Sequence, residues 1–320
     1  MAEEVPNLRV TRRLERRRRE RRRRIVALST VAAVLVVIIL AASGEFGGSN
    51  NTSDASGHHD GTGNAATHTG STATTVTKNP LHLASVRRWI ASRAGVNVSI
   101  ALEDLKTGQE WLLNPGARDQ TASIVKEDIL ETRLHQTIAA GEPLSDAEGS
   151  VAQGMIEASD NTDATELWDA DGDASGINAY NAQAGLTQTQ AGQNGYWGET
   201  MTSAADQIKL LRHLVFANKL LTPAARSYEL YLMSNIDPGE NWGVTGGVPR
   251  GVHVALKNGW VPLSSYTDWE VNSTGWIKGD SRDYLLTILT AHEPDYEPYG
   301  VATINQLSRL IYAALAPGKH

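Results

Sequence analysis

The sequence contains no cysteine among its 320 residues. This absence excludes disulfide bonds, thiolate metal ligands, a cysteine nucleophile and a lipid-modified N-terminal cysteine. The length suffices for one large domain or two modest ones, and the apolar fraction of 41% is ordinary for a packed protein. The fold must therefore be stabilised by packing alone.

Long apolar runs are scarce, and the one that stands out follows an arginine-rich start. Residues 1–24 hold 11 arginines and 4 glutamates, and residues 25–42 are uncharged and apolar. Eighteen such residues just span a bilayer as a helix, and positive charge on one flank keeps that flank in the cytoplasm. We expect a cytoplasmic tail (1–24) and a transmembrane signal anchor (25–42). A cleaved signal peptide is the alternative, with small residues at positions 41–44 as the cleavage site, and would make the protein secreted.

Positive charge is also scarce after the arginine run. The remaining residues carry 18 basic and 32 acidic side chains, a net charge of −14. So acidic a segment is a poor binder of nucleic acid, and we expect no nucleic-acid partner.

Large apolar residues are almost missing from residues 43–79, which are rich in Gly, Ser, Thr and Asn. This composition predicts a disordered linker that tethers the following domain near the membrane, outside the cytoplasm. The linker contains His58, His59, Asp60 and His68. Without surrounding structure to fix their geometry we expect no metal site and no cofactor.

Residues 80–320 form the predicted folded domain. Apolar spacing predicts helices over 81–95, 204–221 and 301–316, a hairpin around 106–108, and late strands over 251–260, 268–279 and 283–292. Strands at both ends with helices between them predict an α+β fold. One antiparallel sheet would be built from both ends of the domain, the terminal helices would flank it, and the central block would be a separate all-α lobe. A cleft would form between the lobes.

The stretch TASIVKEDIL contains Ser123 and Lys126 at the head of an apolar helical run. Positions i and i+3 share one face of a helix, so the lysine amine can reach the serine hydroxyl and activate it as a nucleophile. An exposed polar pair is the alternative interpretation of this motif alone.

Two further motifs follow in order. Ser159-Asp160-Asn161 lies in the helical block, and Lys257-Asn258-Gly259 lies on a late strand. The first alone could be a helix N-cap, and Asn258-Gly259 alone could be a hairpin turn. Together, the three motifs resemble the ordered set S-x-x-K, S-D-N and K-[T/S]-G of class A serine β-lactamases and penicillin-binding proteins. The resemblance covers essentially residues 80–320.

The resemblance implies the role of each residue. Ser123 would be acylated with Lys126 as its base, and Ser159 would relay a proton to the leaving nitrogen. Asn161 and Lys257 would bind substrate, Asn258 would replace the hydroxyl residue that contacts the substrate carboxylate, and Gly259 would complete the motif. The backbone amides of Ser123 and Trp260 would form the oxyanion hole.

One expected group is missing. Class A enzymes carry a deacylating glutamate in the loop before the helix that resembles AADQIKLL, whereas this loop reads NAQAGLTQTQAGQNGYWGETM and has no E-x-x-L-N pattern. Glu199 matches the following segment better, and Glu166 lies on the helix after Asn161. By the resemblance, the residues needed for acylation are thus nearly complete, whereas a base for rapid deacylation is not evident.

We therefore expect a monomeric, membrane-anchored β-lactamase-like serine hydrolase that acts on β-lactams or peptidoglycan-derived amides through an acyl-serine. A D-Ala-D-Ala-type peptidase or esterase on the same fold, and a catalytically silent penicillin-binding-like module, remain the alternatives.

Overall fold

The computed structural model describes residues 79–263 and 268–316. The predicted tail, membrane anchor and most of the linker lie outside the described residues. Within the described ranges, no helix combines the length and apolar character needed to cross a bilayer.

A five-stranded antiparallel sheet forms the centre of the domain, with strand order β2-β1-β7-β6-β5. The two N-terminal strands pair with β7 from the C-terminal end, with Ile100 opposite Ile288, so the predicted origin of the sheet is confirmed. The strands are β1 (Asn97–Asp104), β2 (Gln109–Leu113), β5 (His253–Pro262), β6 (Trp269–Gly279) and β7 (Arg282–Glu293), and a separate pair joins β3 (Asp119–Gln120) to β4 (Met201–Thr202).

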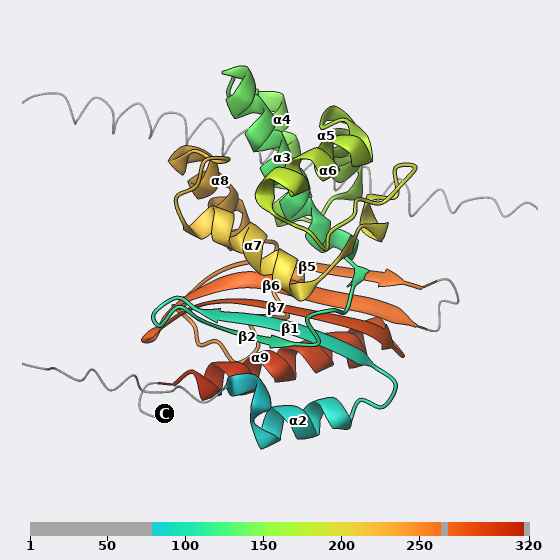
Figure 1. Cartoon of the computed structure of the whole chain (residues 1–320), viewed down its shortest axis with the longest axis vertical. Coiled ribbons are helices and arrows are strands. Elements are labelled where there is room, and N and C mark those ends of the chain that lie inside the picture. Colours follow the sequence, from blue (N-terminus) through green and yellow to red (C-terminus); the bar gives the residue numbers. More distant parts are fainter. Residues whose placement is uncertain (1–78, 264–267, 317–320) are drawn as a thin grey trace, which may run out of the picture. The chain divides into compact units, whose positions relative to one another are not determined.

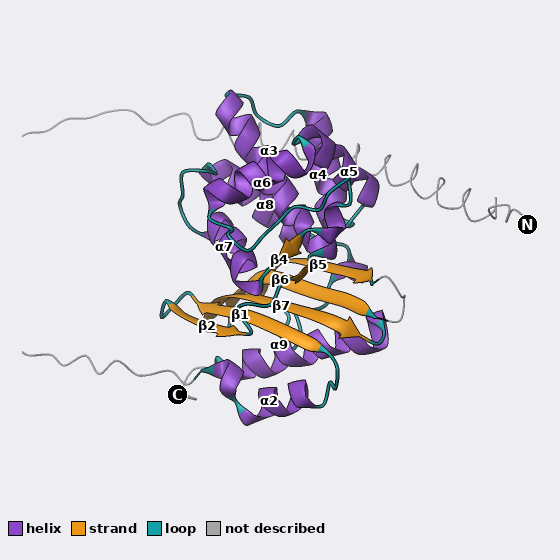
Figure 2. Cartoon of the chain, turned by 45° about the vertical axis from the view of Figure 1, so that its right-hand side comes forward, coloured by secondary structure: helices purple, strands orange, loops and turns teal. Residues whose placement is uncertain are grey.

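Helices cover both faces of the sheet (Figure 1). The terminal helices α2 and α9 pack on one face, and the other helices gather on the opposite side as the predicted all-α lobe (Figure 2). The helices are α2 (Ala84–Ala91), α3 (Val125–Ala140), α4 (Asp146–Glu157), α5 (Asn161–Ala170), α6 (Asp173–Ala184), α7 (Ala204–Val215), α8 (Pro223–Ser234) and α9 (Ala302–Ala314).

The apolar stripes of two helices explain this arrangement. Ile208, Leu211 and Leu214 of α7 are buried in a core between the α-lobe and the sheet. Ile304 and Leu307 of α9 are buried in a second core on the other face. The named residues of each stripe are three positions apart, which places their side chains on one side of the helix.

The first predicted helix is shorter than expected. It ends at Ala91 instead of continuing to Gly95. Gly95 has a φ of 85°, a left-handed conformation that glycine adopts without steric cost, and it lies in the turn that leads into β1. The glycine therefore marks the turn after the helix, not its cap.

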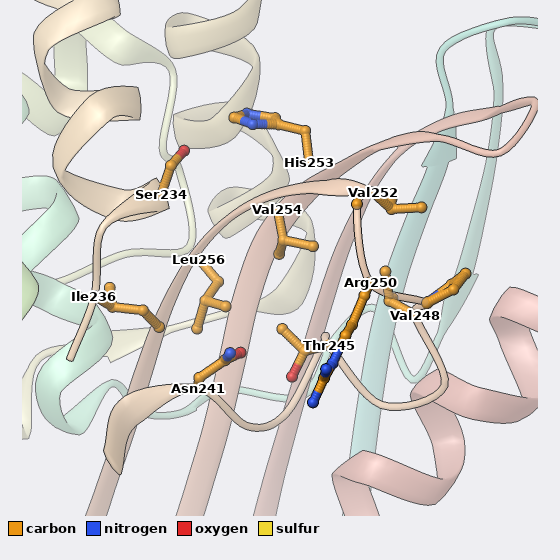
Figure 3. Close-up of a pocket in the computed structure, with 12 residues that line it drawn as sticks. Ser234, Ile236, Asn241, Thr245, Val248, Arg250, Val252, His253, Val254 and Leu256 are labelled. Atoms are coloured by element: carbon orange, nitrogen blue, oxygen red, sulfur yellow. The ribbon is translucent and has the colours of Figure 1, made fainter. Parts of the chain in front are cut away.

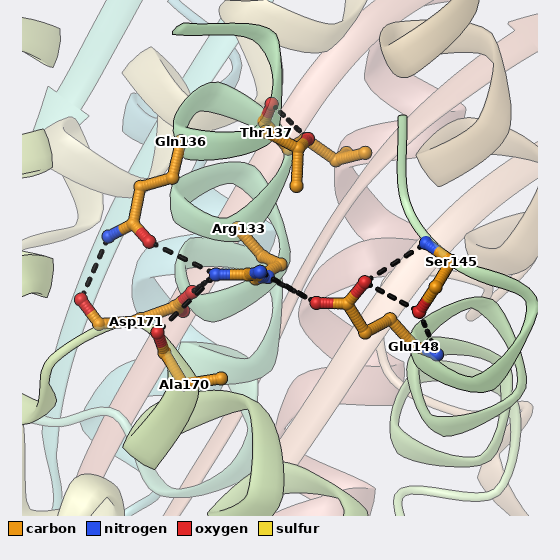
Figure 4. A network of polar contacts seen from close by, with 8 residues as sticks. Arg133, Gln136, Thr137, Ser145, Glu148, Ala170 and Asp171 are labelled. Atoms are coloured by element: carbon orange, nitrogen blue, oxygen red, sulfur yellow. Dashed lines mark hydrogen bonds and ion pairs between the residues drawn. The ribbon is translucent and has the colours of Figure 1, made fainter. Parts of the chain in front are cut away.

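Polar contacts fix the helices of the α-lobe to one another (Figure 4). Arg133 on α3 pairs with Glu148 on α4 at 2.6 Å. Its guanidinium also donates to the Ala170 carbonyl at the end of α5. Glu148 in turn closes a capping box with Ser145, which satisfies backbone amides at the start of α4. This network holds α3, the helix that follows the S-x-x-K serine, in a defined position.

Candidate active site

The predicted nucleophile lies on a short 3₁₀ turn, η2 (Ala122–Ile124), immediately before α3. Ala122 has a φ of 47°, a left-handed conformation that is uncommon for a non-glycine residue. The turn exposes Ser123 in part while Lys126, one turn later, is fully buried. The two side chains approach to 3.0 Å between Oγ and Nζ, as the spacing predicted.

The S-D-N motif lies against the same amine. Lys126 Nζ lies 3.1 Å from Ser159 Oγ and donates to the Ser159 carbonyl at 2.8 Å. It also donates to Asn161 Oδ1 at 2.8 Å. Asp160 caps α5, accepting from the amides of Thr162 and Asp163. The N-cap interpretation is therefore correct for Asp160, and the cap places its two neighbours beside the lysine.

The third motif completes the cluster from the edge strand β5. Lys257 is fully buried, and its Nζ donates to Ser159 Oγ at 3.0 Å. Ser159 Oγ thus lies between two lysine amines. Four side chains from three separate chain segments, Ser123, Lys126, Ser159 and Lys257, form one connected group.

Burial lowers the pKa of both lysines, and the positive charge of Lys257 lowers that of Lys126 further. For Lys126, burial and then the positive charge of Lys257 lower the pKa to about 6. Burial lowers the pKa of Lys257 to about 8. At neutral pH the Lys126 amine is therefore largely neutral and can accept a proton, while Lys257 is largely charged.

The glycine of the third motif allows β5 to approach the nucleophile. A methyl group on Gly259 would lie 2.6 Å from the backbone nitrogen of Ser123 and 2.8 Å from that of Ile124. Only a residue without a side chain fits there. The strand therefore brings the next residue, Trp260, close to the Ser123 amide, where the predicted oxyanion hole would form.

The hydrogen bonds of Asn258 differ from the substrate-binding role that the resemblance implies for it. Its side chain is 2% exposed. Both hydrogens of Nδ2 are used within the protein, donated to the carbonyls of Glu240 at 2.6 Å and Trp242 at 3.1 Å. Asn258 holds the segment before β5 in place, and its amide has no hydrogen left for a substrate carboxylate.

Sequence reasoning missed Trp197, which lies in the shortened loop. It belongs to the 3₁₀ turn η3 (Trp197–Glu199), and its ring centroid lies 5.0 Å from Lys126 Nζ. The indole Nε1 donates to Thr165 Oγ1 on α5 at 3.1 Å. Glu199, the carboxylate considered from the sequence, is exposed. An aromatic ring therefore lies against the Lys126 amine, while Glu199 is exposed to solvent.

Two hollows lie near these residues. One of about 510 Å³ follows the exposed face of α5 and is lined by Asn161, Thr165 and Glu166, among others. Another of about 390 Å³ lies at the edge of the sheet, between the end of α8 and the first half of β5 (Figure 3). Asn241, Val254 and Leu256 line it, and the four connected side chains do not. The cluster around Ser123 is the candidate site because the four predicted side chains converge there.

Buried acidic residues lie on α3 directly after Lys126. Glu127, Asp128 and Glu131 are almost completely buried, as is Glu229 on α8. Burial raises the pKa of Asp128 to about 8, although Asn181 Nδ2 donates to its Oδ2 at 3.0 Å. Burial also raises the pKa of the three glutamates well above the usual range. At neutral pH the Asp128 carboxyl is therefore held mainly in the protonated form. Among the residues described, no three His, Cys, Asp or Glu side chains are arranged to hold a metal ion.

Comparison with known proteins agrees with this geometry. Residues 148–315, more than half of the chain, match the sequence model of the Beta-lactamase enzyme family. The chain therefore belongs to this family.

Similar sequences and structures extend the match. The "Putative lipoprotein LppW" of Mycobacterium tuberculosis and that of Mycobacterium bovis are each 27% identical over 232 residues, covering 69% of this chain and 71% of theirs. Among solved structures, PBP-A has a TM-score of 0.62 at 19% identity, covering 71% of this chain and 94% of PBP-A. The TLA-1 extended-spectrum β-lactamase has a TM-score of 0.64 at 13% identity, covering 72% of this chain and 97% of TLA-1. The predicted β-lactamase/penicillin-binding fold is confirmed, while the catalytic roles of the site residues stay predictions.

Proposed function

We propose that this protein is a serine hydrolase that forms an acyl-enzyme at Ser123 with β-lactams or related cell-wall peptide amides, and releases the acyl group slowly. The observation that carries the proposal is the 3.0 Å approach of Ser123 Oγ to a buried amine whose pKa is lowered to about 6.

The proposed acylation uses the connected side chains in order. Neutral Lys126 accepts the proton of Ser123 Oγ as the oxygen attacks the carbonyl carbon. The amides of Ser123 and Trp260 stabilise the oxyanion, which needs fixed donors. Ser159, in contact with both lysines, passes a proton to the leaving nitrogen, and the C–N bond breaks.

Slow deacylation follows from the loop that covers Lys126. Hydrolysis of the ester requires an oriented water and a base. In this chain the loop places the Trp197 ring against Lys126 Nζ at 5.0 Å. This arrangement favours a peptidase or acyl-trapping protein over a fast β-lactamase. A variant of the structural neighbour PBP-A is known as an acyl-enzyme complex with penicillin G, which supports the first step on this fold.

The same proposal includes export and attachment to the membrane. The mycobacterial relatives are named as lipoproteins, but the sequence here contains no cysteine to carry a lipid. The apolar run at residues 25–42 would supply the anchor instead.

The test is labelling of the full chain with a fluorescent penicillin, read on a gel and by intact mass. We expect one adduct per chain, none in Ser123→Ala, and labelling at least about 10²-fold slower in Lys126→Ala, the lower end of a general base's contribution. Ser150→Ala, an exposed serine on α4, should label like the parent. Labelling that survives Ser123→Ala would contradict the proposal.

A further inference from the structure

A buried asparagine on β6 holds the chain segment that leads into the nucleophile turn. Asn272 Nδ2 donates to the carbonyls of Gln120 at 2.8 Å and Thr121 at 3.2 Å. Its Oδ1 accepts the backbone N–H of Thr290 on β7 at 3.2 Å. The side chain is fully buried, and both of its amide hydrogens are used within the protein. The sheet therefore fixes this amide, and the amide fixes the last two carbonyls before η2.

The carbonyl of Thr121 also closes the turn that carries the nucleophile. It accepts the backbone N–H of Ile124 at 3.3 Å, so the amide of Ser123 lies inside this turn. The N–H of Thr121 donates to the carbonyl of Thr200 at 2.8 Å, in the loop before α7. Thr121 is thus held on one side by this loop and on the other by Asn272. Its position decides where the Ser123 N–H points.

The hydrogen bonds of Asn272 directly precede a strained residue. Ala122 has a φ of 47°, in the left-handed region. A non-glycine residue persists in such a conformation only where the contacts around it leave no relaxed alternative. The bonds to the carbonyls of Gln120 and Thr121 supply such contacts, because they hold the chain up to the residue before Ala122.

The strand that bears Asn272 lies next to the strand of the third motif. Asn272 stands opposite Gly259 in the β5–β6 pair, and opposite residues project to the same face of an antiparallel sheet. A methyl group on Gly259 would lie 2.6 Å from the Ser123 nitrogen and 2.8 Å from the Thr121 carbonyl oxygen. β5 therefore leaves room for the nucleophile segment, and β6 holds the segment there.

We propose that Asn272 is a positioning residue for acyl transfer, which holds η2 where the amides of Ser123 and Trp260 can bind the oxyanion together. Donors of this kind stabilise a transition state only if they are already fixed in place. Asn272 acts through the backbone, so its loss should slow the chemical step and leave the binding of the acyl donor unchanged. This inference rests on the proposed acyl transfer to Ser123.

The first measurement is acylation of the full chain by penicillin G at increasing concentrations, read by intact mass after acid quench. Ser123 Oγ forms the C–O bond, the C–N bond of the lactam breaks, and the serine proton passes through Lys126 and Ser159 to the departing nitrogen. The data give the rate constant of acylation at saturation and the half-saturating concentration. Asn272→Ala removes the whole amide, whereas Asn272→Asp keeps an oxygen that can accept from Thr290 and removes the Nδ2 donors.

We expect the rate constant at saturation to fall by about 10- to 100-fold in both variants, below the roughly 10²- to 10³-fold that loss of one oxyanion donor costs. The half-saturating concentration should stay within about twofold of the parent's, as for an interaction that acts only in the transition state.

The second measurement is the affinity for phenylboronic acid, found by competition with a fluorescent penicillin. Ser123 Oγ forms a bond to boron, no bond breaks, and the serine proton passes to Lys126. The tetrahedral adduct resembles the transition state and places a boronate oxygen in the oxyanion hole. Its affinity should weaken in the Asn272 variants by about the same factor as the rate constant.

The matched control is Thr287→Val. Thr287 is fully buried on β7, and its Oγ1 lies 2.8 Å from Thr274 Oγ1 on β6. This variant removes a buried hydrogen bond between the same two strands, and the bond is made to Thr274 and not to the nucleophile segment. Thr287→Val should keep both constants of the parent. Near-UV circular dichroism and urea unfolding establish that each variant is folded.

The possible failures are distinguishable. Folded Asn272 variants that are acylated at the parent's rate, a loss confined to the half-saturating concentration, or an equal loss in Thr287→Val would overturn this inference alone. If Asn272→Ala does not fold, Asn272→Asp decides, and if neither folds, Asn272 serves the fold and the inference is overturned. A parent chain that gains no mass from penicillin G overturns the proposed acyl transfer, and this inference with it.

Discussion

Two buried lysines share one serine hydroxyl at the centre of the site. Lys126 and Lys257 lie 3.1 and 3.0 Å from Ser159 Oγ. Both amines are buried, so a positive charge on one disfavours a positive charge on the other. The pKa of Lys126 is lowered to about 6 and that of Lys257 to about 8, so the two amines lose their protons in different pH ranges. This separation allows one lysine to act as a base while the other remains a cation.

The rate of acylation should therefore depend on pH as a bell with its maximum near pH 7. On the acid side Lys126 gains a proton below about pH 6 and cannot accept another, and on the alkaline side Lys257 loses its charge above about pH 8. Lys257→Met removes the repelling charge, so the acid limb should move to higher pH. The measurement is the second-order rate constant of acylation with penicillin G between pH 5 and 10. A rate independent of pH would contradict the assignment.

The residues of the site were predictable to different degrees. Ser123 and Lys126 follow from the i, i+3 spacing, which is a local property of a helical turn. Lys257 could be tied to them only through the resemblance, because more than a hundred residues separate the motifs. Trp197 lies in the loop between α6 and α7, where no periodicity relates a side chain to a site built from other segments.

At the scale of elements, the loop between α6 and α7 lies against the candidate site and would control the access of water to the proposed acyl ester. Its turn η3 packs on η2, the turn of Ser123, and Trp197 donates to Thr165 on α5. Gly192 allows the loop to fold back against Tyr196, since a methyl group on Gly192 would lie 2.1 Å from the Tyr196 carbonyl oxygen. The loop therefore holds the indole in place over Lys126.

Replacing Trp197 by alanine should speed deacylation, by about tenfold, because water would gain access to the ester beside Lys126, a positioned base of the kind that contributes 10²-fold or more. The half-life of the adduct, followed by intact mass after excess donor is removed, measures this effect. Tyr196→Ala, which removes the neighbouring 61% exposed ring, is the matched control and should keep the parent's half-life. An unchanged half-life in Trp197→Ala would show that the indole does not control water.

The acidic residues of α3 make a prediction about stability. Asp128 has a folded-state pKa of about 8 against an ordinary value of 3.8, so the folded state binds the extra proton. Its contribution to stability is fully present below about pH 4 and is lost as pH rises to about 8, at up to ~1.4 kcal/mol per pH unit.

Asp128→Asn should make the decline of the free energy of unfolding between pH 4 and 8 less steep, by the slope that corresponds to about one bound proton. Urea unfolding at several pH values measures this slope. Asp169→Asn, which changes an exposed carboxylate on α5, should leave the slope unchanged. A slope that Asp128→Asn leaves intact would mean that Asp128 is ionised in the folded protein.

The elements themselves were largely predictable. The hairpin β1–β2 turns at Lys106-Thr107-Gly108 as expected, with Gly108 at a φ of 70°. The three late strands follow from their apolar content and turn signals. The path of the loop around Trp197 was not predictable, because it depends on contacts with η2 and α5 and not on local propensity.

At the scale of the whole molecule, charge is divided between the two ends of the chain. Residues 1–24 carry a net charge of +7 and the rest carries −14. The predicted topology assigns the basic end to the cytoplasm and everything after residue 42 to the outside. Alkaline phosphatase fused after Lys78 should be active in cells. An inactive fusion, together with an active cytoplasmic reporter at the same junction, would contradict the topology.

The most direct test of the account is a rapid-quench time course of the full chain with penicillin G, read by intact mass and by product release. We predict a burst of about one equivalent that coincides with one acyl adduct on Ser123, followed by a slow steady state, because Lys126 can serve as the base of acylation while the Trp197 ring keeps water from the acyl ester. Fast turnover without a burst, or a burst without an adduct on Ser123, would contradict the account.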